Sequence, residues 1–180
     1  LATFEFLRDS NGDFYFLEVN PRVQVEHTVT EMITGVDLVS MGIRVAAGEG
    51  IPVQQSDVKI TGHAIQVRIN AENPKTLSPS PGRIWECHWP SGPGVRVDSH
   101  AHTGYDMPAS FDSLLAKIIV WTSNRADAFS RMKAALRETM LLGVDTLIPL
   151  HQAILNNPDF ISGDVTIRFL EEHPELLNGE

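Results

Sequence analysis

The feature that most constrains this chain lies at its start, where two short strand-forming runs flank an Asn-Gly pair. Residues 3–8 and 14–19 are rich in Phe, Tyr, Leu and Val, and Asn11-Gly12 lies between them. Such runs are typical of β-strands, and Asn-Gly suits the positive φ angles of a type I′ turn. The sequence therefore predicts a β-hairpin whose two-residue loop is Asn11-Gly12.

The register of this hairpin brings two acidic side chains together. With a two-residue loop, Glu5 lies directly opposite Glu18, and like charges at that spacing of about 5 Å repel. A divalent cation would reverse that interaction, because carboxylate oxygens suit Mg²⁺ or Mn²⁺. Asn20 follows Glu18 on the same face of the strand. The pattern indicates a cation site, and two glutamates on a solvated sheet face stay open as the alternative.

The segment that follows the hairpin, residues 18–27, carries a dense set of polar groups. Arg22 offers a planar fork for a small oxyanion, and Gln24 adds amide donors. Glu26 has the chemistry of a general base. Taken singly, Arg22 and Glu26 could form a surface pair, and His27 could cap the next helix. Together with the paired acids, these residues favour an anion-and-metal site.

The rest of the chain predicts an α+β fold. Residues 62–70 alternate between apolar and polar side chains, as a half-buried strand does, with Ile65, Val67 and Ile69 on one face. Residues 48–60 resemble a linker, and Asn157-Pro158 is expected to end a helix. We expect helices at about 29–34, 37–47, 125–141 and 146–156, and strands at about 83–88, 94–99 and 114–122.

Composition narrows the class of protein. The single cysteine, Cys87, allows no internal disulfide and fits a reducing compartment. A formal net charge of -9 over 180 residues argues against nucleic-acid binding. No apolar run approaches the roughly 18 residues that a membrane span needs. Because Leu1 is not a methionine and strand-like residues follow at once, we expect a piece of a longer polypeptide.

Five ordered motifs carry a resemblance to a known family. The longest is FYFLEVNPRVQVEHTVTEMITGVDLV, and GHAIQVRINAE, PSPGRI, GVRVDS and FDSLLAKII follow in the same order. The chain thereby resembles the C-terminal part of a biotin carboxylase. The resemblance implies that residues 1–50 end an ATP-grasp domain, as a β-hairpin plus helices. It also implies that residues 51–180 form a biotin carboxylase C-terminal domain, with a mainly antiparallel sheet and flanking helices.

The resemblance also implies a reaction, in which ATP and bicarbonate form carboxyphosphate and biotin on a carrier protein is carboxylated. Mg²⁺ or Mn²⁺ bridging the ATP phosphates would be bound by Glu5 and Glu18, with Asn20 assisting. Pro21 stands where many acyl-CoA carboxylases have threonine, although other members also have proline. The implied acceptor is of the acetyl-CoA or propionyl-CoA type, as in fatty acid biosynthesis.

Five residues would act on the substrates. By the same resemblance, bicarbonate would be bound by Arg22, Gln24 and the backbone of Val25, and Glu26 would deprotonate it. Arg68 would stabilise the negative oxygen of biotin. A surface charge on a half-exposed strand is the alternative for Arg68.

Four further positions match family sites more loosely. Leu7 and Ile167 would line the adenine pocket, and Asp112 would be an acid near the active site. Arg96 lies in the region where bacterial subunits dimerise. The alternatives are plain core for Leu7 and Ile167, and a turn or cap for Asp112.

The expected setting follows from the family. The intact subunit would form a homodimer and work with a biotin carboxyl carrier protein or domain and a carboxyltransferase component. It would be cytoplasmic, or in the mitochondrial matrix of a eukaryote. This chain has no Gly-rich phosphate loop, so alone it is expected to be inactive.

Two other functions compete with this interpretation. One is another ATP-grasp ligase such as carbamoyl-phosphate synthetase, which shares an acid-Val-Asn-Pro-Arg stretch. The run Gln24-Val25-Glu26-His27 and the later strand with Arg68 argue against it. The other is a non-catalytic assembly module that docks a partner subunit.

Overall fold

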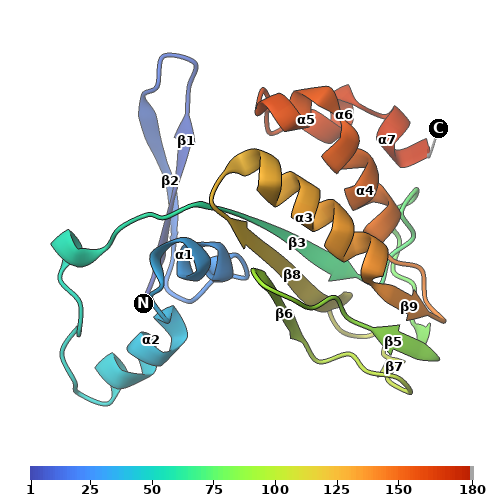
Figure 1. Cartoon of the computed structure of the whole chain (residues 1–180), viewed down its shortest axis with the longest axis horizontal. Coiled ribbons are helices and arrows are strands. Elements are labelled where there is room, and N and C mark those ends of the chain that lie inside the picture. Colours follow the sequence, from blue (N-terminus) through green and yellow to red (C-terminus); the bar gives the residue numbers. More distant parts are fainter. Residues whose placement is uncertain (179–180) are drawn as a thin grey trace. The chain divides into compact units, whose positions relative to one another are not determined.

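The computed structural model describes residues 1–178, which form two compact units (Figure 1). The N-terminal unit spans residues 1–61, and the C-terminal unit begins at Gly62. The division lies at the end of the segment expected to be a linker, residues 48–60. The proposed domain boundary between residues 50 and 51 stays a prediction.

The N-terminal unit opens with a hairpin of strands β1 (Thr3–Arg8) and β2 (Phe14–Asn20). Its turn is longer than the two residues expected: Asp9 accepts from the backbone N–H groups of Asn11 and Asp13 at 2.9 and 3.0 Å. Of the Asn-Gly pair, Gly12 alone has a positive φ, +92°. The type I′ prediction is therefore wrong, because the Asp9 side chain organises a wider loop instead.

The predicted pairing of Glu5 with Glu18 nevertheless occurs. An irregularity between Glu5 and Phe6 shifts the register by one residue. It offsets the wider turn, so the two glutamates meet as expected on one face of the ladder.

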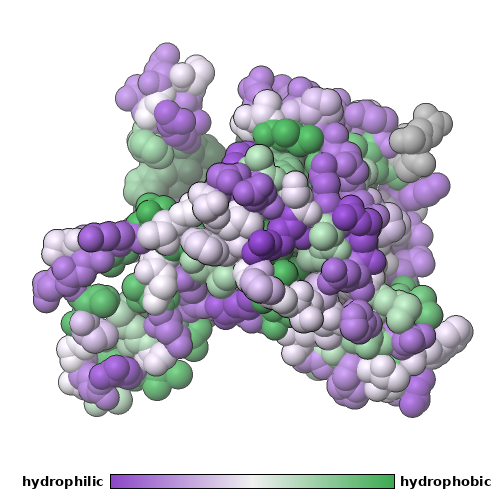
Figure 2. Space-filling view, viewed as in Figure 1, coloured by the Kyte–Doolittle hydropathy of each residue, from purple (hydrophilic) through white to green (hydrophobic). Residues whose placement is uncertain are grey.

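The hairpin exposes apolar side chains on both of its faces. In Figure 2 its tip is hydrophilic and its stem carries hydrophobic residues. Phe4, Phe14 and Phe16 on one face are each about 60–70% exposed, and Leu7 and Tyr15 on the other are 46% and 56% exposed.

Two helices and one 3₁₀ turn complete the N-terminal unit: α1 (His27–Thr34), α2 (Leu38–Ala46) and η1 (Gln55–Asp57). The Asp37 carboxylate accepts from the Ser40 N–H at 2.8 Å and caps α2, at the start of the helix expected over residues 37–47. Gly48, with φ of +92°, lies just past the end of α2.

A three-stranded antiparallel sheet organises the C-terminal unit. Its strands are β3 (His63–Asn70), β8 (Leu114–Thr122) and β6 (Val95–Ser99), in the order β3-β8-β6. The predicted alternation of β3 is present, since Val67 and Ile69 are buried and Arg68 between them is exposed.

Helix α3 (Arg125–Glu138) contributes the other side of the main core. Its Ala128, Met132 and Leu136 pack in one cluster with Ile118 and Val120 of β8. The helix ends three residues earlier than expected, because Met140–Leu142 forms strand β9 and pairs with β5 (Glu86–His88).

The remaining elements are short and flank this core. The predicted strand at 83–88 is divided between β4 and β5, and a helix follows the expected stop at Asn157-Pro158 because Asn157 caps it. These elements are β4 (Gly82–Arg83), β7 (Asp106–Met107), α4 (Ile148–Asn156), α5 (Pro158–Ser162), α6 (Phe169–Glu172) and α7 (Glu175–Asn178). The α+β class with antiparallel sheets is confirmed. No helix in the described part is long and apolar enough to cross a membrane.

Candidate active site

The two facing glutamates of the hairpin are joined by one amide. Asn20 Nδ2 donates to Glu5 Oε1 at 2.8 Å and to Glu18 Oε1 at 2.9 Å. Gln24 Nε2 donates to the same Glu5 oxygen at 2.5 Å. One oxygen from each carboxylate is therefore directed toward a common point, which an amide donor occupies in this arrangement.

This cluster has the chemistry of a site for a hard cation. Across residues 1–178, no group of three or more His, Cys, Asp or Glu side chains could hold a metal ion, so any cation at Glu5 and Glu18 needs a further kind of ligand. The amide oxygen of Asn20 can supply it after rotation of the side chain. Two carboxylates and one amide oxygen fit Mg²⁺, which prefers oxygen ligands and keeps several waters.

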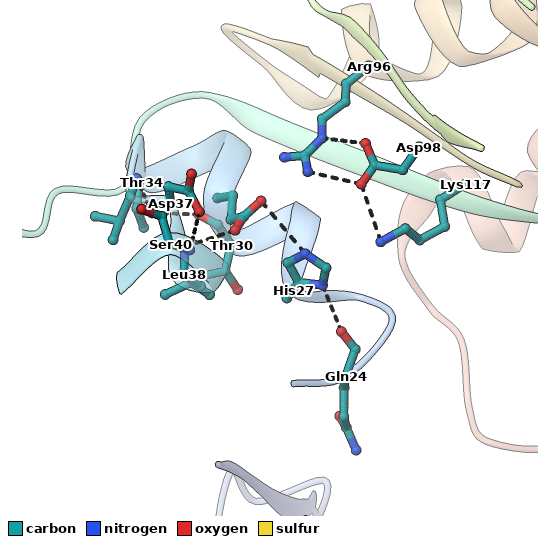
Figure 3. Close-up of polar contacts among 12 residues, drawn as sticks. Gln24, His27, Thr30, Thr34, Asp37, Leu38, Ser40, Arg96, Asp98 and Lys117 are labelled. Atoms are coloured by element: carbon teal, nitrogen blue, oxygen red, sulfur yellow. Dashed lines mark hydrogen bonds and ion pairs between the residues drawn. The ribbon is translucent and has the colours of Figure 1, made fainter. Parts of the chain in front are cut away.

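The loop after β2 has a defined backbone. The Arg22 N–H donates to the Asn20 carbonyl at 2.8 Å, and Arg22 Nη1 donates to the Val23 carbonyl at 3.3 Å. The Gln24 carbonyl accepts from the His27 N–H at 3.2 Å and lies 2.8 Å from His27 Nδ1 (Figure 3). The exposed Arg22 guanidinium keeps further N–H groups for an anion.

Two of the residues that the resemblance assigns to bicarbonate chemistry, Gln24 and Glu26, line a pocket, whereas Arg22 is not part of its lining. Gln24, Glu26 and His27 line a cavity of about 290 Å³, together with the apolar Phe4 and Leu38. Glu26 is the N-cap residue of α1, and its carbonyl accepts from the Val29 N–H at 3.0 Å. The Glu26 carboxylate is exposed, so solvent and small anions can reach it.

In the C-terminal unit, Arg68 lies on the polar face of β3 and pairs across the sheet with Lys117 of β8. Asp98 of β6 pairs with Lys117 from the other side, with its Oδ2 3.5 Å from the ammonium. Arg96 donates two hydrogen bonds of 2.8 and 2.9 Å to the same carboxylate (Figure 3). Three cations and one anion thus share this face of the sheet.

Asp98 compensates part of the positive charge on this face, through its ion pairs with Arg96 and Lys117. Burial favours a raised pKa for its carboxyl, but the hydrogen bonds and charges of Arg96 and Lys117 outweigh burial and lower the pKa overall. Asp98 and Lys117 were not identified from the sequence. The alternation in Val95–Ser99 could have placed Asp98 beside Arg96, but the pairing of β6 with β8 is a long-range contact that no local pattern reveals.

The more loosely matched positions are exposed rather than core. Leu7 on β1 is 46% exposed, and Ile167, between α5 and α6, is 92% exposed. Asp112 accepts from the Leu114 N–H at 2.8 Å, so it forms the expected turn contact, and it lines a pocket of about 560 Å³. Plain core is therefore wrong for Leu7 and Ile167, while the functional roles stay predictions.

Two family descriptions match this chain. Residues 66–172 match the "Biotin carboxylase C-terminal domain" and residues 1–54 match the "Carbamoyl-phosphate synthase L chain, ATP binding domain". The first match alone covers more than half of the 180 residues.

Individual relatives agree with these matches. The chain is 52% identical to a biotin carboxylase of Nostoc sp. over 95% of its own length, and 51% identical to a pyruvate carboxylase component of Methanothermobacter thermautotrophicus over 99%. It spans 38% and 36% of the lengths of those two proteins.

Solved structures share the fold. The biotin carboxylase domain dimer of Hydrogenobacter thermophilus 2-oxoglutarate carboxylase, in complex with MgADP, ADP and bicarbonate, gives a TM-score of 0.95 at 46% identity. That comparison covers 98% of this chain and 39% of the other. The multifunctional pyruvate carboxylase of Rhizobium etli gives 0.93 at 40% identity, covering 98% and 17%. The chain belongs to the biotin carboxylase family.

Proposed function

We propose that this chain is part of a biotin carboxylase, which uses ATP and bicarbonate to carboxylate biotin on a carrier protein. The observation that carries the proposal is the cluster in which the Asn20 amide joins Glu5 and Glu18, at the head of the loop that bears Arg22 and Glu26. A cation site next to an anion-binding loop is what transfer of a phosphoryl group to a small oxyanion requires.

In this proposal, Glu5, Glu18 and Asn20 hold Mg²⁺, and Mn²⁺ can replace it. The cation supplies neutralisation of the negative charge on the ATP phosphates. The MgADP and bicarbonate in the Hydrogenobacter thermophilus relative support this assignment. Leu7 and Ile167 contribute apolar surface to the adenine ring.

Bicarbonate binds to the Arg22 guanidinium, the Gln24 amide and the Val25 N–H. Since Gln24 uses one N–H for Glu5, its second remains for the anion. The Glu26 carboxylate accepts the bicarbonate proton, and a bicarbonate oxygen attacks the γ-phosphorus of ATP. The bond to the bridging oxygen of ADP breaks, and ADP and carboxyphosphate result.

Carboxyphosphate then separates into CO₂ and phosphate beside biotin. The phosphate takes the proton from the ureido nitrogen, and that nitrogen forms a bond to the carbon of CO₂. Arg68 donates hydrogen bonds to the ureido oxygen as negative charge develops there. Asp112 lies near the reacting groups in this proposal.

The proposal extends to the assembly. The intact subunit forms a homodimer through the Arg96 region and works with a carrier protein and a carboxyltransferase. Acetyl-CoA or propionyl-CoA is the acceptor, and the isolated chain, which spans 38% of its Nostoc relative, is inactive.

The test is phosphate release from ATP by the intact polypeptide that carries this chain, with and without bicarbonate and free biotin. We expect release that needs bicarbonate and rises with biotin. Release that ignores biotin but responds to an amine would instead favour a ligase of the carbamoyl-phosphate type, whose family description matches residues 1–54. Adding a carboxyltransferase with acetyl-CoA, propionyl-CoA or pyruvate then identifies the acceptor.

A further inference from the structure

The start of helix α4 contacts the outer edge of β3, the strand that carries Arg68. β3 is an edge strand in the order β3-β8-β6, so alternate carbonyls face away from the sheet. Two of them are bound from the α4 segment: the Leu147 N–H donates to the Asn70 carbonyl at 3.2 Å, and His151 Nε2 lies 2.7 Å from the Arg68 carbonyl. The imidazole of His151 thus binds the Arg68 carbonyl in the way that the N–H of a neighbouring strand would.

The geometry defines which nitrogen of this imidazole carries the proton. A carbonyl oxygen can only accept a hydrogen bond, so Nε2 of His151 carries the proton and donates it. Burial lowers the pKa of His151, and this effect exceeds the opposite effect of its bond to the Arg68 backbone. His151 is therefore a neutral donor near pH 7.

On its outer edge β3 is not closely covered by the side chains of α4. A pocket of about 400 Å³ lies between β3 and α4, and its lining includes Val67, Arg68, His151 and Ile154. The His151 hydrogen bond therefore holds the Arg68 carbonyl on this edge, while Val67 and Ile69 are buried in the main core. On the opposite edge, Arg68 pairs with Lys117 of β8.

We propose that His151 is a positioning residue for Arg68: its hydrogen bond fixes the Arg68 peptide group, and so the origin of the guanidinium side chain, for stabilisation of the biotin oxyanion. This inference rests on the proposed function of Arg68. A shift of about 1 Å in a catalytic group can cost a factor of 100 in rate, so loss of the His151 hydrogen bond should have a measurable effect.

The experiment compares two variants of the intact enzyme. His151→Leu removes the donor and keeps the bulk, whereas His151→Gln places an amide N–H near the Nε2 position. His88→Leu, at an exposed position on β5, is the matched control. The measured quantity is the ratio of biotin-stimulated to biotin-independent phosphate release, at saturating ATP and bicarbonate and below the unfolding temperature of every variant.

We expect this ratio to fall about 10-fold in His151→Leu, on the order of a small displacement of a catalytic group, and to recover largely in His151→Gln. It should stay within twofold in the control. In an Arg68→Ala background, His151→Leu should have no further effect on the ratio, because its action passes through Arg68.

Two results would overturn the inference. An equal loss of biotin-stimulated and biotin-independent release in His151→Leu would assign His151 a structural role. An undiminished effect of His151→Leu in the Arg68→Ala background would show that it acts elsewhere. Failure of the proposed function is distinguishable, since Arg68→Ala would then leave the ratio unchanged.

Discussion

Glu5 and Glu18 face each other across the β1–β2 hairpin, and one amide nitrogen bonds an oxygen of each. Two carboxylates in this position repel unless a donor or a cation lies between them. The Asn20 amide compensates part of that repulsion. A cation would compensate more, so in the proposed metal site this pair would couple the stability of the hairpin to metal binding.

Replacing one acid of the pair should separate stability from metal binding. Glu18→Gln removes a charge and leaves Asn20 an oxygen to donate to. In the intact enzyme without metal, we expect unfolding free energy to rise by about 0.2–1 kcal/mol, the range for a cross-strand pair. The gain in melting temperature on adding Mg²⁺ and ADP should fall strongly.

Thermal unfolding with and without Mg²⁺ and ADP measures both effects. Glu86→Gln, exposed on β5, is the control and should keep the full response to Mg²⁺ and ADP. A Glu18→Gln enzyme with an unreduced response would rule out Glu18 as a ligand.

A second prediction concerns the base. Glu26→Gln keeps the size and polarity of the side chain but cannot accept a proton. We expect bicarbonate-dependent ATP cleavage to fall by 100-fold or more, the range for loss of a general base. ADP binding, measured by calorimetry, should be retained.

Glu49→Gln serves as the comparison, because Glu49 is an exposed acid of the same unit that pairs with Arg44. It should leave bicarbonate-dependent cleavage at the level of the unmodified enzyme. Substantial cleavage by Glu26→Gln would remove Glu26 from the role of base.

The local patterns of the sequence predicted most of the main elements. The alternation of residues 62–70 gave β3 and its buried face, and Asp37 marked the start of α2. Both of these features depend only on residues that lie close together in the sequence. The pairing of Glu5 with Glu18 was also predicted, although the turn was wrong, because the irregularity at Glu5 and Phe6 offset a loop of different length.

Contacts between distant segments could not be predicted in the same way. Residues 140 and 141 continue the expected helix, yet with residue 142 they form β9 and pair with β5 more than fifty residues earlier. His151 meets the Arg68 carbonyl across a separation of 83 residues. Such contacts depend on how the elements pack against one another, which no local pattern in the sequence encodes.

A third prediction contrasts two isoleucines of the C-terminal unit. Ile118 is fully buried in the main core, whereas Ile167 is 92% exposed. Ile118→Ala should destabilise the intact enzyme by about 2–5 kcal/mol, since it leaves a cavity. Ile167→Ala should change stability by less than about 0.5 kcal/mol and raise the KM for ATP.

Urea denaturation and steady-state kinetics test both variants, and each serves as the control for the other. An unchanged KM for ATP in Ile167→Ala would argue against its place in the adenine pocket. A small loss of stability in Ile118→Ala would mean that the core can collapse around the missing atoms.

The last prediction is an acid sensitivity that originates in two histidines of the C-terminal unit. Burial lowers the pKa of His151, and burial together with the charge of Arg125 lowers the pKa of His63. An unfolded chain has histidines with a pKa of about 6.5, so below that pH the unfolded state binds more protons than the folded state. Stability should therefore fall as the pH drops from about 7 toward 5.

The comparison of unmodified enzyme with His151→Gln isolates one of these groups. Unfolding free energy from urea curves at pH 8, 7, 6 and 5 should fall less steeply in the variant, because it cannot take up that proton. His88→Gln, at an exposed site, should keep the original slope. Asp98 adds little to the slope in this range, because its pKa is lowered from an ordinary value of 3.8 and its own loss of stability comes mainly at lower pH. Identical slopes in His151→Gln and the unmodified enzyme would mean that His151 titrates alike in the folded and unfolded states.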